Sequence, residues 1–244
     1  MAGPRFTGIW REDARARAAY AEGAGIYRII PRAIAIPSTT RALRDIVSWA
    51  AAEGVPLVPR GAGSGMPGGN VGDGVIVDLG ALDGAPLSIE PAQCAATTGG
   101  AVRLAMLDQE AGKAGLRMPV DPSSARFATV GGAVSTNAAG SRTVRYGPVR
   151  RWVKRLSLVT AAGDLVRLER GCAADHEAAL RIEEEIGTTL HQGRWRVATK
   201  FPRIRKNTAG YALDAYVESG DLLDLIIGAE GTLGFATEVG WRLE

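Results

Sequence analysis

The chain has 244 residues, a formal net charge of +3 at pH 7, and 46% hydrophobic and 23% charged residues. This length allows one large domain or two small ones with a buried core, and the composition excludes a disordered or fibrous protein. No stretch approaches the roughly 18 uncharged apolar residues that a membrane span needs. The N-terminus lacks the apolar run of a secretory signal, so a cytoplasmic location is expected.

The chain offers few residues that bind metals. Cys94 and Cys172 lie far apart and fit no ligand spacing, so both are predicted to be reduced, structural thiols. His176 and His191 are the only histidines, and no local motif adds the carboxylates that a metal site would need. No metal site is predicted, and neither histidine is assigned a catalytic role.

A strand, a capped helix and a second strand are predicted between residues 33 and 58. Ala33–Ile36 has the β-branched content of a buried strand and is followed by a proline. Ser38 or Thr39 caps an amphipathic helix, and Gly54 stands at the position where glycine commonly ends one. Val55–Val58 is the second strand, so the segment predicts a βαβ unit with a right-handed crossover.

Seven glycines crowd into the next stretch, PRGAGSGMPGGNVGDG, residues 59–74. Successive backbone N–H groups form anion-binding nests, so the stretch suits a pyrophosphate; a long flexible loop is the alternative. Gly63, Gly65 and Gly68 also satisfy the dinucleotide fingerprint of nucleotide-binding folds. That fingerprint must open a helix, whereas residues 75–79 (VIVDL) read as a strand, so the match is rejected.

The pattern changes after residue 79, and a subdomain boundary is predicted near residue 90. Strands or a helix are expected, in chain order, at 87–90, 94–98, 102–114 (helix), 156–160 with 165–168 (a hairpin), 175–186 (an exposed helix), 222–227 (a helical turn) and 235–241.

The expected fold class is α+β, with two α/β subdomains. Residues 1–30 form an Arg- and Ala-rich N-terminal helical segment whose role is unreadable. A small βαβ sheet is expected over about 31–90, and a larger mixed or antiparallel sheet with helices over about 91–244.

Three distant stretches share an unusual content of glycine and small polar residues: 59–69, 121–140 and 228–238. Each has too few large side chains to pack a core alone. Together they are suited to line one groove along an extended ligand. Three unrelated loops are the alternative.

The motifs PRGAGSG (Pro59–Gly65), DPSS…TVGG…TNAAG…RYG (Asp121–Gly147), KNTAGYAL (Lys206–Leu213) and GAEGTLGFATE (Gly228–Glu238) occur in this order. In order and spacing they resemble the FAD-binding domain of the vanillyl-alcohol oxidase superfamily, also called the PCMH-type or FAD-linked oxidase N-terminal domain. The resemblance covers roughly residues 30–243. It is strongest to glycolate oxidase and D-lactate dehydrogenase flavoproteins.

The resemblance implies that FAD lies between the two subdomains, with the pyrophosphate on the first motif, the phosphates and isoalloxazine along the second, and the adenosine half under the last. The implied cofactor-binding residues are Pro59, Arg60, Gly61, Ala62, Gly63, Ser64, Gly65, Pro122, Ser123, Ser124, Thr129, Gly131, Gly132, Ser135, Thr136, Asn137, Ala138, Gly140, Glu230, Gly231, Thr232, Leu233, Gly234, Phe235 and Ala236.

One departure from the family's motifs and one further resemblance bear on the flavin. Many members link it covalently through a histidine that follows the second glycine of the loop, and Ser64 stands at that position, so a non-covalent flavin is implied. Lys206, Asn207 and Tyr211 resemble a stretch near the flavin edge. A surface basic run followed by a packed tyrosine explains them equally well.

The resemblance implies an FAD-linked oxidase or dehydrogenase that oxidises a small 2-hydroxy acid by hydride transfer to flavin N5. In such flavoproteins a C-terminal substrate or cap domain supplies the substrate-binding groups, and the chain ends where the FAD domain ends. A truncated chain, a split-gene half or a subunit of a larger complex are therefore all open, and a separate cap-domain or electron-transfer subunit is an expected partner. No general base is assigned. The alternative is a non-catalytic flavin-binding subunit of a hetero-oligomeric complex.

A basic cluster comprises Arg142, Arg145, Arg150, Arg151, Lys154 and Arg155. Nucleic-acid binding favours such clusters when aromatic side chains are presented for stacking. Only Tyr146 and Trp152 are close, so surface charge or attraction of an anionic ligand is preferred. No nucleic-acid partner is predicted.

Overall fold

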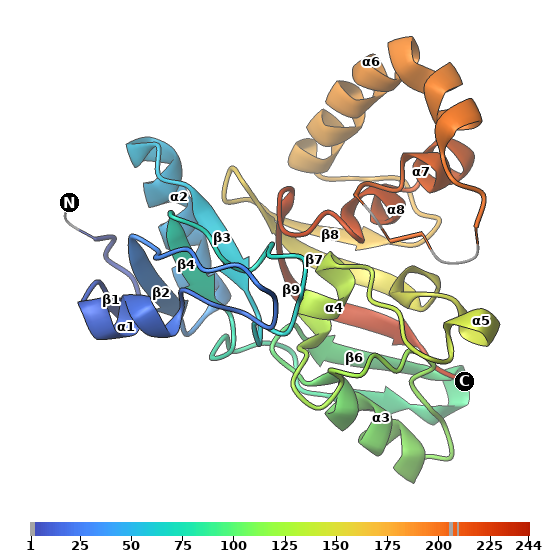
Figure 1. Ribbon diagram of the computed structural model, residues 1–244. Coiled ribbons are helices and arrows are strands. Elements are labelled where there is room, and N and C mark those ends of the chain that lie inside the picture. Colours follow the sequence, from blue (N-terminus) through green and yellow to red (C-terminus); the bar gives the residue numbers. More distant parts are fainter. Residues whose placement is uncertain (1–2, 205–206, 209) are drawn as a thin grey trace.

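The computed structural model describes residues 3–204, 207–208 and 210–244. Figure 1 shows two lobes, each built on one β-sheet, with helices α6 and α7 at the edge of the larger lobe far from the N-terminus. The α+β fold class with two α/β subdomains is confirmed.

The smaller sheet has the strand order β1-β2-β4-β3. Its strands are β1 (Gly8–Arg11), β2 (Ala33–Pro37), β3 (Leu57–Arg60) and β4 (Val75–Asp78). β4 pairs in parallel with both β2 and β3, and β1 pairs antiparallel with β2. Residues 61–74, the glycine-rich stretch, connect the adjacent parallel strands β3 and β4.

One prediction for this lobe needs correction. The N-terminal segment contains the strand β1 as well as the helix α1 (Ala14–Ala19); β1 forms by pairing with a strand 20 or more residues away along the chain, which local pattern does not reveal. The predicted βαβ unit is present: β2 and β3, joined by α2, lie parallel in one sheet with β4 between them.

Helix α2 (Thr40–Glu53) begins and ends where its caps predict. The Thr39 side chain accepts a hydrogen bond from the Ala42 N–H, and Gly54 adopts the left-handed conformation with φ of 63°. Its apolar face, with Leu43 and Ile46 fully buried, packs on the smaller sheet.

The larger sheet has the order β5-β6-β9-β7-β8 with every neighbouring pair antiparallel. Its strands are β5 (Ser88–Glu90), β6 (Ala95–Gly99), β7 (Val153–Thr160), β8 (Leu165–Glu169) and β9 (Gly234–Arg242). The predicted hairpin is the β7–β8 pair. Because β5 already belongs to this sheet, the chain changes sheet before the boundary expected near residue 90.

The remaining helical elements are α3 (Leu104–Lys113), α4 (Val130–Ser135), α5 (Thr143–Tyr146), α6 (Glu177–Lys200), α7 (Leu213–Ser219), α8 (Leu222–Ile226) and the 3-10 turns η1 (Pro91–Gln93) and η2 (Val149–Arg151). α6 continues past residue 186, where the expected helix ended, through Gly187 and Gly193. α4 was not expected, because a glycine pair opens it.

Two hydrophobic cores form, one in each lobe, and they meet where the lobes join. Val159 and Phe235 come from β7 and β9 of the larger sheet but pack into the core of the smaller lobe with Leu43, Ile46 and Val77. This junction is where the glycine-rich connection leaves β3. Within the described residues, no helix combines the length and apolarity that crossing a bilayer requires.

Candidate functional site

A cavity lies at the junction of the two lobes and encloses about 970 Å³, part of it open to solvent. Its walls come from the three small-residue stretches, with additions from Asn70 and from Leu79 and Gly100, which directly follow β4 and β6. The lining residues are Pro59–Gly65, Pro67, Gly69, Asn70, Leu79, Gly100, Pro122, Ser124, Ala128, Thr129, Gly131, Gly132, Ala133, Ser135, Thr136, Ala138, Glu230, Gly231, Gly234, Phe235 and Ala236.

Direct contacts hold the three stretches together. The first meets the second where Gly61 lies against Thr129 so closely that a Cβ on Gly61 would strike the threonine Oγ1. The first meets the third where Gly231 lies against the Pro59 ring. The Glu230 N–H donates to the Ser135 carbonyl at 2.8 Å, which joins the third to the second. The convergence expected from composition is present.

The glycine-rich wall offers a row of unused donors. Among the described residues, the N–H groups of residues 61–65 donate to no backbone or side-chain acceptor, and all five residues line the cavity. Gly63 has φ of +68°, a conformation that residues with a Cβ rarely adopt. A run of free amides in a partly enclosed site is a nest for an anion such as a diphosphate, so the residues present fit the expected cofactor.

The side chain of Arg60 supports this wall from behind. Its guanidinium donates to the carbonyls of Glu22 at 2.8 Å, Asn70 at 3.2 Å and Tyr20 at 3.3 Å. Burial lowers the pKa of the guanidinium from its ordinary value, while Asp78 and Tyr20 oppose the shift. Arg60 therefore borders the cavity while its charged group binds the N-terminal segment.

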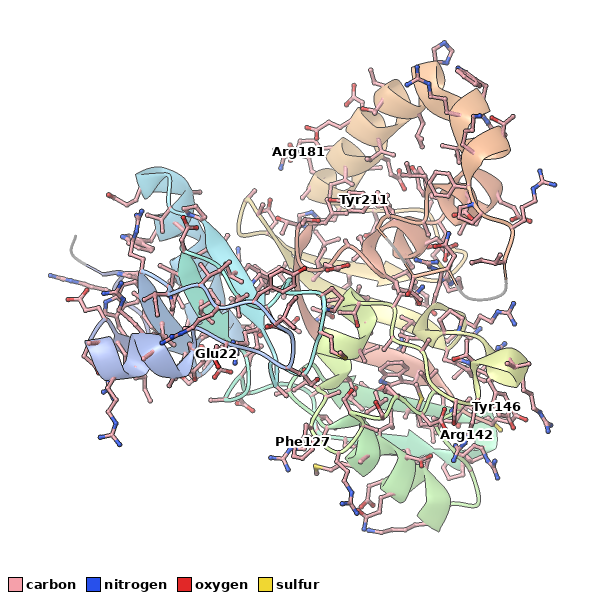
Figure 2. All side chains as sticks on the ribbon, in the orientation of Figure 1. Glu22, Phe127, Arg142, Tyr146, Arg181 and Tyr211 are labelled. Atoms are coloured by element: carbon pink, nitrogen blue, oxygen red, sulfur yellow. The ribbon has the colours of Figure 1, made fainter. Side chains whose placement is uncertain are left out.

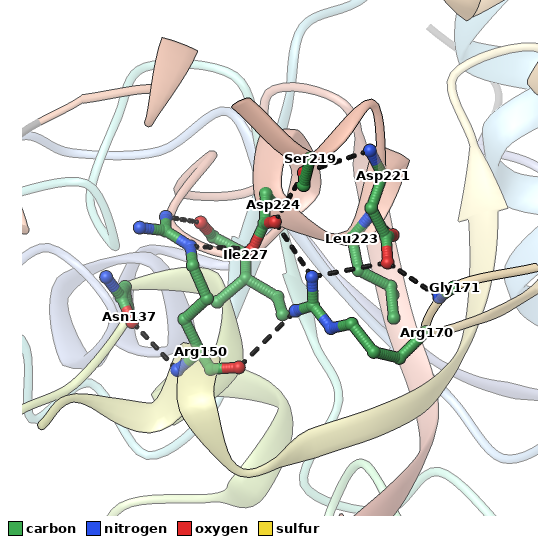
Figure 3. Close-up of polar contacts among 9 residues, drawn as sticks. All are labelled: Asn137, Arg150, Arg170, Gly171, Ser219, Asp221, Leu223, Asp224 and Ile227. Carbon is green, nitrogen blue, oxygen red and sulfur yellow. Dashed lines mark hydrogen bonds and ion pairs between the residues drawn. The ribbon is translucent and has the colours of Figure 1, made fainter. Parts of the chain in front are cut away.

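A second wall segment, residues 227–233 (the facing wall), lines the cavity through Glu230 and Gly231 and rests on buried ion pairs (Figure 3). Arg150 donates to the Ile227 carbonyl at 2.5 Å and lies 3.6 Å from the Asp224 carboxylate, whose other oxygen is 2.8 Å from Arg170. Burial lowers the pKa of Arg150, and Asp224 is the main group opposing that shift. Asp221 also pairs with Arg170, at 3.3 Å.

Five of the expected cofactor-binding residues lie off the cavity lining. Ser123 is exposed, and Gly140 packs on the Asp121 backbone. Asn137 is buried and accepts from the Arg150 N–H at 3.0 Å. Thr232 lines a neighbouring cavity of about 920 Å³, and Leu233 packs against the larger core.

Sequence reasoning missed several lining residues: Pro67, Gly69, Asn70, Leu79, Gly100, Ala128 and Ala133. Gly69 and Asn70 lie inside the glycine-rich stretch, so its composition was the available signal. Gly100 lies where β6 ends and packs against Ala236 of β9. Only the sheet pairing brings it to the cavity.

The remaining candidates are the stretch expected near the flavin edge, the histidines and possible metal ligands. Lys206 lies outside the described residues. The Tyr211 hydroxyl, in the segment between α6 and α7 (Figure 2), shares a 2.5 Å hydrogen bond with the Thr232 Oγ1. The His176 Nδ1 accepts from the Ala178 N–H at the start of α6. Searched over the described residues, the chain has no group of three His, Cys, Asp or Glu side chains suited to a metal ion.

Three of the six residues of the basic cluster have acidic partners. Arg142 pairs with Asp121 at 3.3 Å and Arg145 with Glu244 at 3.8 Å, and Arg150 is buried against Asp224. Figure 2 shows Arg142 on the side of the larger lobe far from the smaller one. These pairs reduce the positive field that a nucleic-acid surface would need.

Comparison with known proteins identifies the domain. A family described as "FAD binding domain" matches residues 31–169, which is more than half of the chain. The chain belongs to this family. FAD is its cofactor, and the resemblance seen in the four motifs is confirmed.

The curated relatives are named as dehydrogenases or as an oxidase subunit. A D-2-hydroxyglutarate dehydrogenase of Stutzerimonas stutzeri is 33% identical over 216 residues, covering 88% of this chain and 38% of that protein. The glycolate oxidase subunit GlcD of Bacillus subtilis is 30% identical over 214 residues, covering 87% of this chain and 37% of that protein. The chain thus spans well under half of the length of these relatives.

Solved structures share the fold. The 6-hydroxy-D-nicotine oxidase of Arthrobacter nicotinovorans superposes with a TM-score of 0.66 at 22% identity, covering 98% of this chain and 42% of that one. This similarity supports the two-lobed architecture and nothing finer.

Proposed function

We propose that the cavity between the lobes holds FAD non-covalently, with its diphosphate on the free amides of residues 61–65. The five consecutive N–H donors of residues 61–65, which have no acceptor among the described residues and lie on one wall of the cavity between the lobes, carry this proposal. The small residues of 122–138 then line the middle of the cofactor, and residues 230–236 cover its adenosine half. Thr232, Leu233, Ser123, Asn137 and Gly140 act by shaping these walls.

The wider activity proposed is oxidation of a small 2-hydroxy acid. It is supported by the similarity to proteins named for D-2-hydroxyglutarate, D-lactate and glycolate. When bound, the flavin would supply the hydride acceptor for such a substrate, and the residues of the cavity walls would hold and orient the flavin. No described residue is assigned as general base. A cytoplasmic location stays a prediction.

The alternative is a non-catalytic flavin-binding subunit that works with a separate cap-domain or electron-transfer subunit. One observation favours it: a relative that resembles 87% of this chain carries the word "subunit" in its name. Both proposals require the same FAD cavity.

Ser64 allows a direct test of the diphosphate position, because it lines the cavity and its φ is not in the left-handed region. Ser64→Asp places a negative charge among the free amides, and Ser64→Asn is its neutral isostere. We expect Ser64→Asp to raise the Kd for FAD at least about tenfold, the equivalent of about 1.4 kcal/mol. Ser64→Asn should change it by less than about threefold. Kd is measured by quenching of flavin fluorescence.

Equal Kd values for the two Ser64 variants would place the diphosphate elsewhere. Acid precipitation of the wild-type protein should release all flavin into the supernatant, and yellow precipitate would contradict non-covalent binding.

The proposed reaction is tested on the protein purified from its host. Under anaerobic conditions, D-lactate, glycolate or D-2-hydroxyglutarate should bleach the visible flavin absorbance. A flavin-loaded protein that none of the 2-hydroxy acids bleaches would favour the alternative.

A further inference from the structure

The N-terminal segment, which the sequence left without a role, lies along the outer side of the glycine-rich stretch. The Ala24 N–H donates to the Gly63 carbonyl at 2.9 Å. Gly23 lies against the Asn70 side chain and Gly25 against the Met66 carbonyl, each too close for a Cβ. Figure 1 shows the loop between α1 and β2 reaching from the smaller lobe toward the junction.

Arg60, near the start of the glycine-rich stretch, joins the N-terminal segment to the stretch. Its guanidinium binds two carbonyls of the N-terminal segment, those of Tyr20 and Glu22, and one of the stretch, that of Asn70. It also stacks over the Tyr20 ring, 5.2 Å from the ring centre. One planar cation therefore holds three main-chain positions in a fixed relation, which a lysine cannot do.

Tyr20 joins the same segment to the end of the stretch. Its hydroxyl donates to the Asp78 Oδ2 at 2.5 Å, and Asp78 is the last residue of β4, the strand that follows the stretch. Ala21, which follows Tyr20 in the chain, is fully buried and anchors the N-terminal segment. Residues 20–25 together with Arg60 and Asp78 thus contact the glycine-rich stretch before, within and after its free amides.

We propose that residues 20–25, Arg60 and Asp78 form a clasp that positions the free amides of residues 61–65 toward the cavity before FAD arrives. A stretch with so many glycines has a large conformational entropy, and ordering each residue costs about 1–2 kcal/mol. A loop already ordered by the clasp does not lose that entropy again on binding, so affinity rises by preorganisation. The proposal rests on the proposed FAD site, and it makes Tyr20, Arg60 and Asp78 positioning residues.

Tyr20→Phe tests the clasp with little change in shape, because it removes one hydroxyl. Tyr27→Phe is the matched control: Tyr27 lies in the same segment with its ring against Gly68, and among the described residues its hydroxyl forms no hydrogen bond. We expect Tyr20→Phe to raise the Kd for FAD about fivefold to tenfold and Tyr27→Phe to leave it within twofold, by analogy with single hydrogen bonds to charged groups.

A second readout does not need FAD. Hydrogen exchange of the Ala24 and Val71 amides, which donate to the Gly63 and Gly68 carbonyls, should be about fivefold to tenfold faster in FAD-free Tyr20→Phe, while amides of β7 and β9 exchange as in the wild type. A Tyr20 that contributes only to overall stability would speed exchange in both places or in neither.

Asp78 provides the rescue. Asp78→Asn keeps a polar partner for the Tyr20 hydroxyl and should bind FAD within about threefold of the wild type, whereas Asp78→Ala should resemble Tyr20→Phe. Asp78→Ala also removes the hydrogen bond that Asp78 Oδ1 accepts from the Gly80 N–H at 2.8 Å. The double variant Tyr20→Phe/Asp78→Ala should therefore lose no more affinity than Asp78→Ala alone, in which the Tyr20–Asp78 bond is already absent.

The outcomes separate the two levels of inference. If the wild type binds no FAD, the FAD site is wrong, and faster exchange of the Ala24 and Val71 amides in Tyr20→Phe still supports the clasp. If the wild type binds FAD but Tyr20→Phe matches it in both Kd and exchange, the clasp is wrong and the FAD site stands. Additive losses in the double variant would also overturn the clasp.

Discussion

The two walls of the FAD cavity are held in opposite ways. The glycine-rich wall, residues 59–70, is held by neutral carbonyls that accept from Arg60. The facing wall, residues 227–233, rests on the buried pairs of Arg150 and Arg170 with Asp224. In both cases a guanidinium donates to main-chain carbonyls, but the free amides lie on the glycine-rich wall, because the amides of residues 227–230 and 232 already donate within the protein.

This difference predicts where the chain is most fragile. Hydrogen bonds to neutral carbonyls in a partly exposed segment contribute about 0.5–1.5 kcal/mol each. A buried ion pair that loses one partner leaves an uncompensated charge and costs about 3–5 kcal/mol. Removing acids behind the facing wall should unfold the larger lobe, whereas changes behind the glycine-rich wall should mainly change cofactor affinity.

The largest effect is expected for Asp224→Ala. The Asp224 side chain is 9% exposed and pairs with two arginines, so the free energy of unfolding should fall by about 3–5 kcal/mol, measured by urea denaturation followed by circular dichroism. Asp175→Ala is the control, because Asp175 is exposed and should change stability by less than about 0.5 kcal/mol. Similar values for both would show that the ion pairs contribute nothing.

Gly231→Ala should affect both walls at once. Gly231 has φ of +84° and its added Cβ would meet the Pro59 ring, so we expect a loss of about 1–3 kcal/mol in stability together with weaker FAD binding. Gly112→Ala is its control, since a Cβ there meets nothing within 4 Å and should stabilise α3 by about 0.5–1 kcal/mol. A Gly231→Ala protein as stable as the wild type would contradict the close contact.

Tyr211→Phe should affect the facing wall alone. It removes the hydroxyl bonded to Thr232 Oγ1, while Thr232 keeps its own bond to the Ala229 carbonyl at 2.7 Å. We expect a loss of about 0.5–1.5 kcal/mol in stability. Amides of residues 61–65 should exchange with solvent at the wild-type rate, and a change there would mean that the walls are coupled.

The smallest effect concerns pH and the glycine-rich wall. Burial, and then the hydrogen bond to Asp78, raise the pKa of Tyr20 from 10.0 to about 12. The folded pKa lies above the unfolded one, so this contribution is complete below pH 10 and is lost as pH rises toward 12. Solvent screening keeps it below about 1 kcal/mol. Unfolding free energies of the wild type and Tyr20→Phe should converge across this interval; a constant difference would contradict the assignment.

The comparison also shows how far sequence reasoning reaches. The caps of α2, the β7–β8 hairpin and the convergence of three small-residue stretches follow from local pattern, because Thr39, Gly54 and the loop glycines act through their own backbone. The roles of Arg60 and Asn137 do not. A guanidinium next to a phosphate-binding loop suggests a phosphate contact, and only the path of residues 20–25 shows that it binds carbonyls instead.

The pairing of β3 with β4 determines what the cofactor can do to the fold. Parallel neighbouring strands are usually joined by a connection of about a dozen residues or more, commonly a helix. Here residues 61–74 connect β3 to β4 without a helix. Whatever binds this segment therefore also joins two strands of one sheet. FAD at 100 times its Kd should stabilise the native protein by about 2.7 kcal/mol. The smaller lobe should therefore unfold at a higher temperature when the flavin is bound.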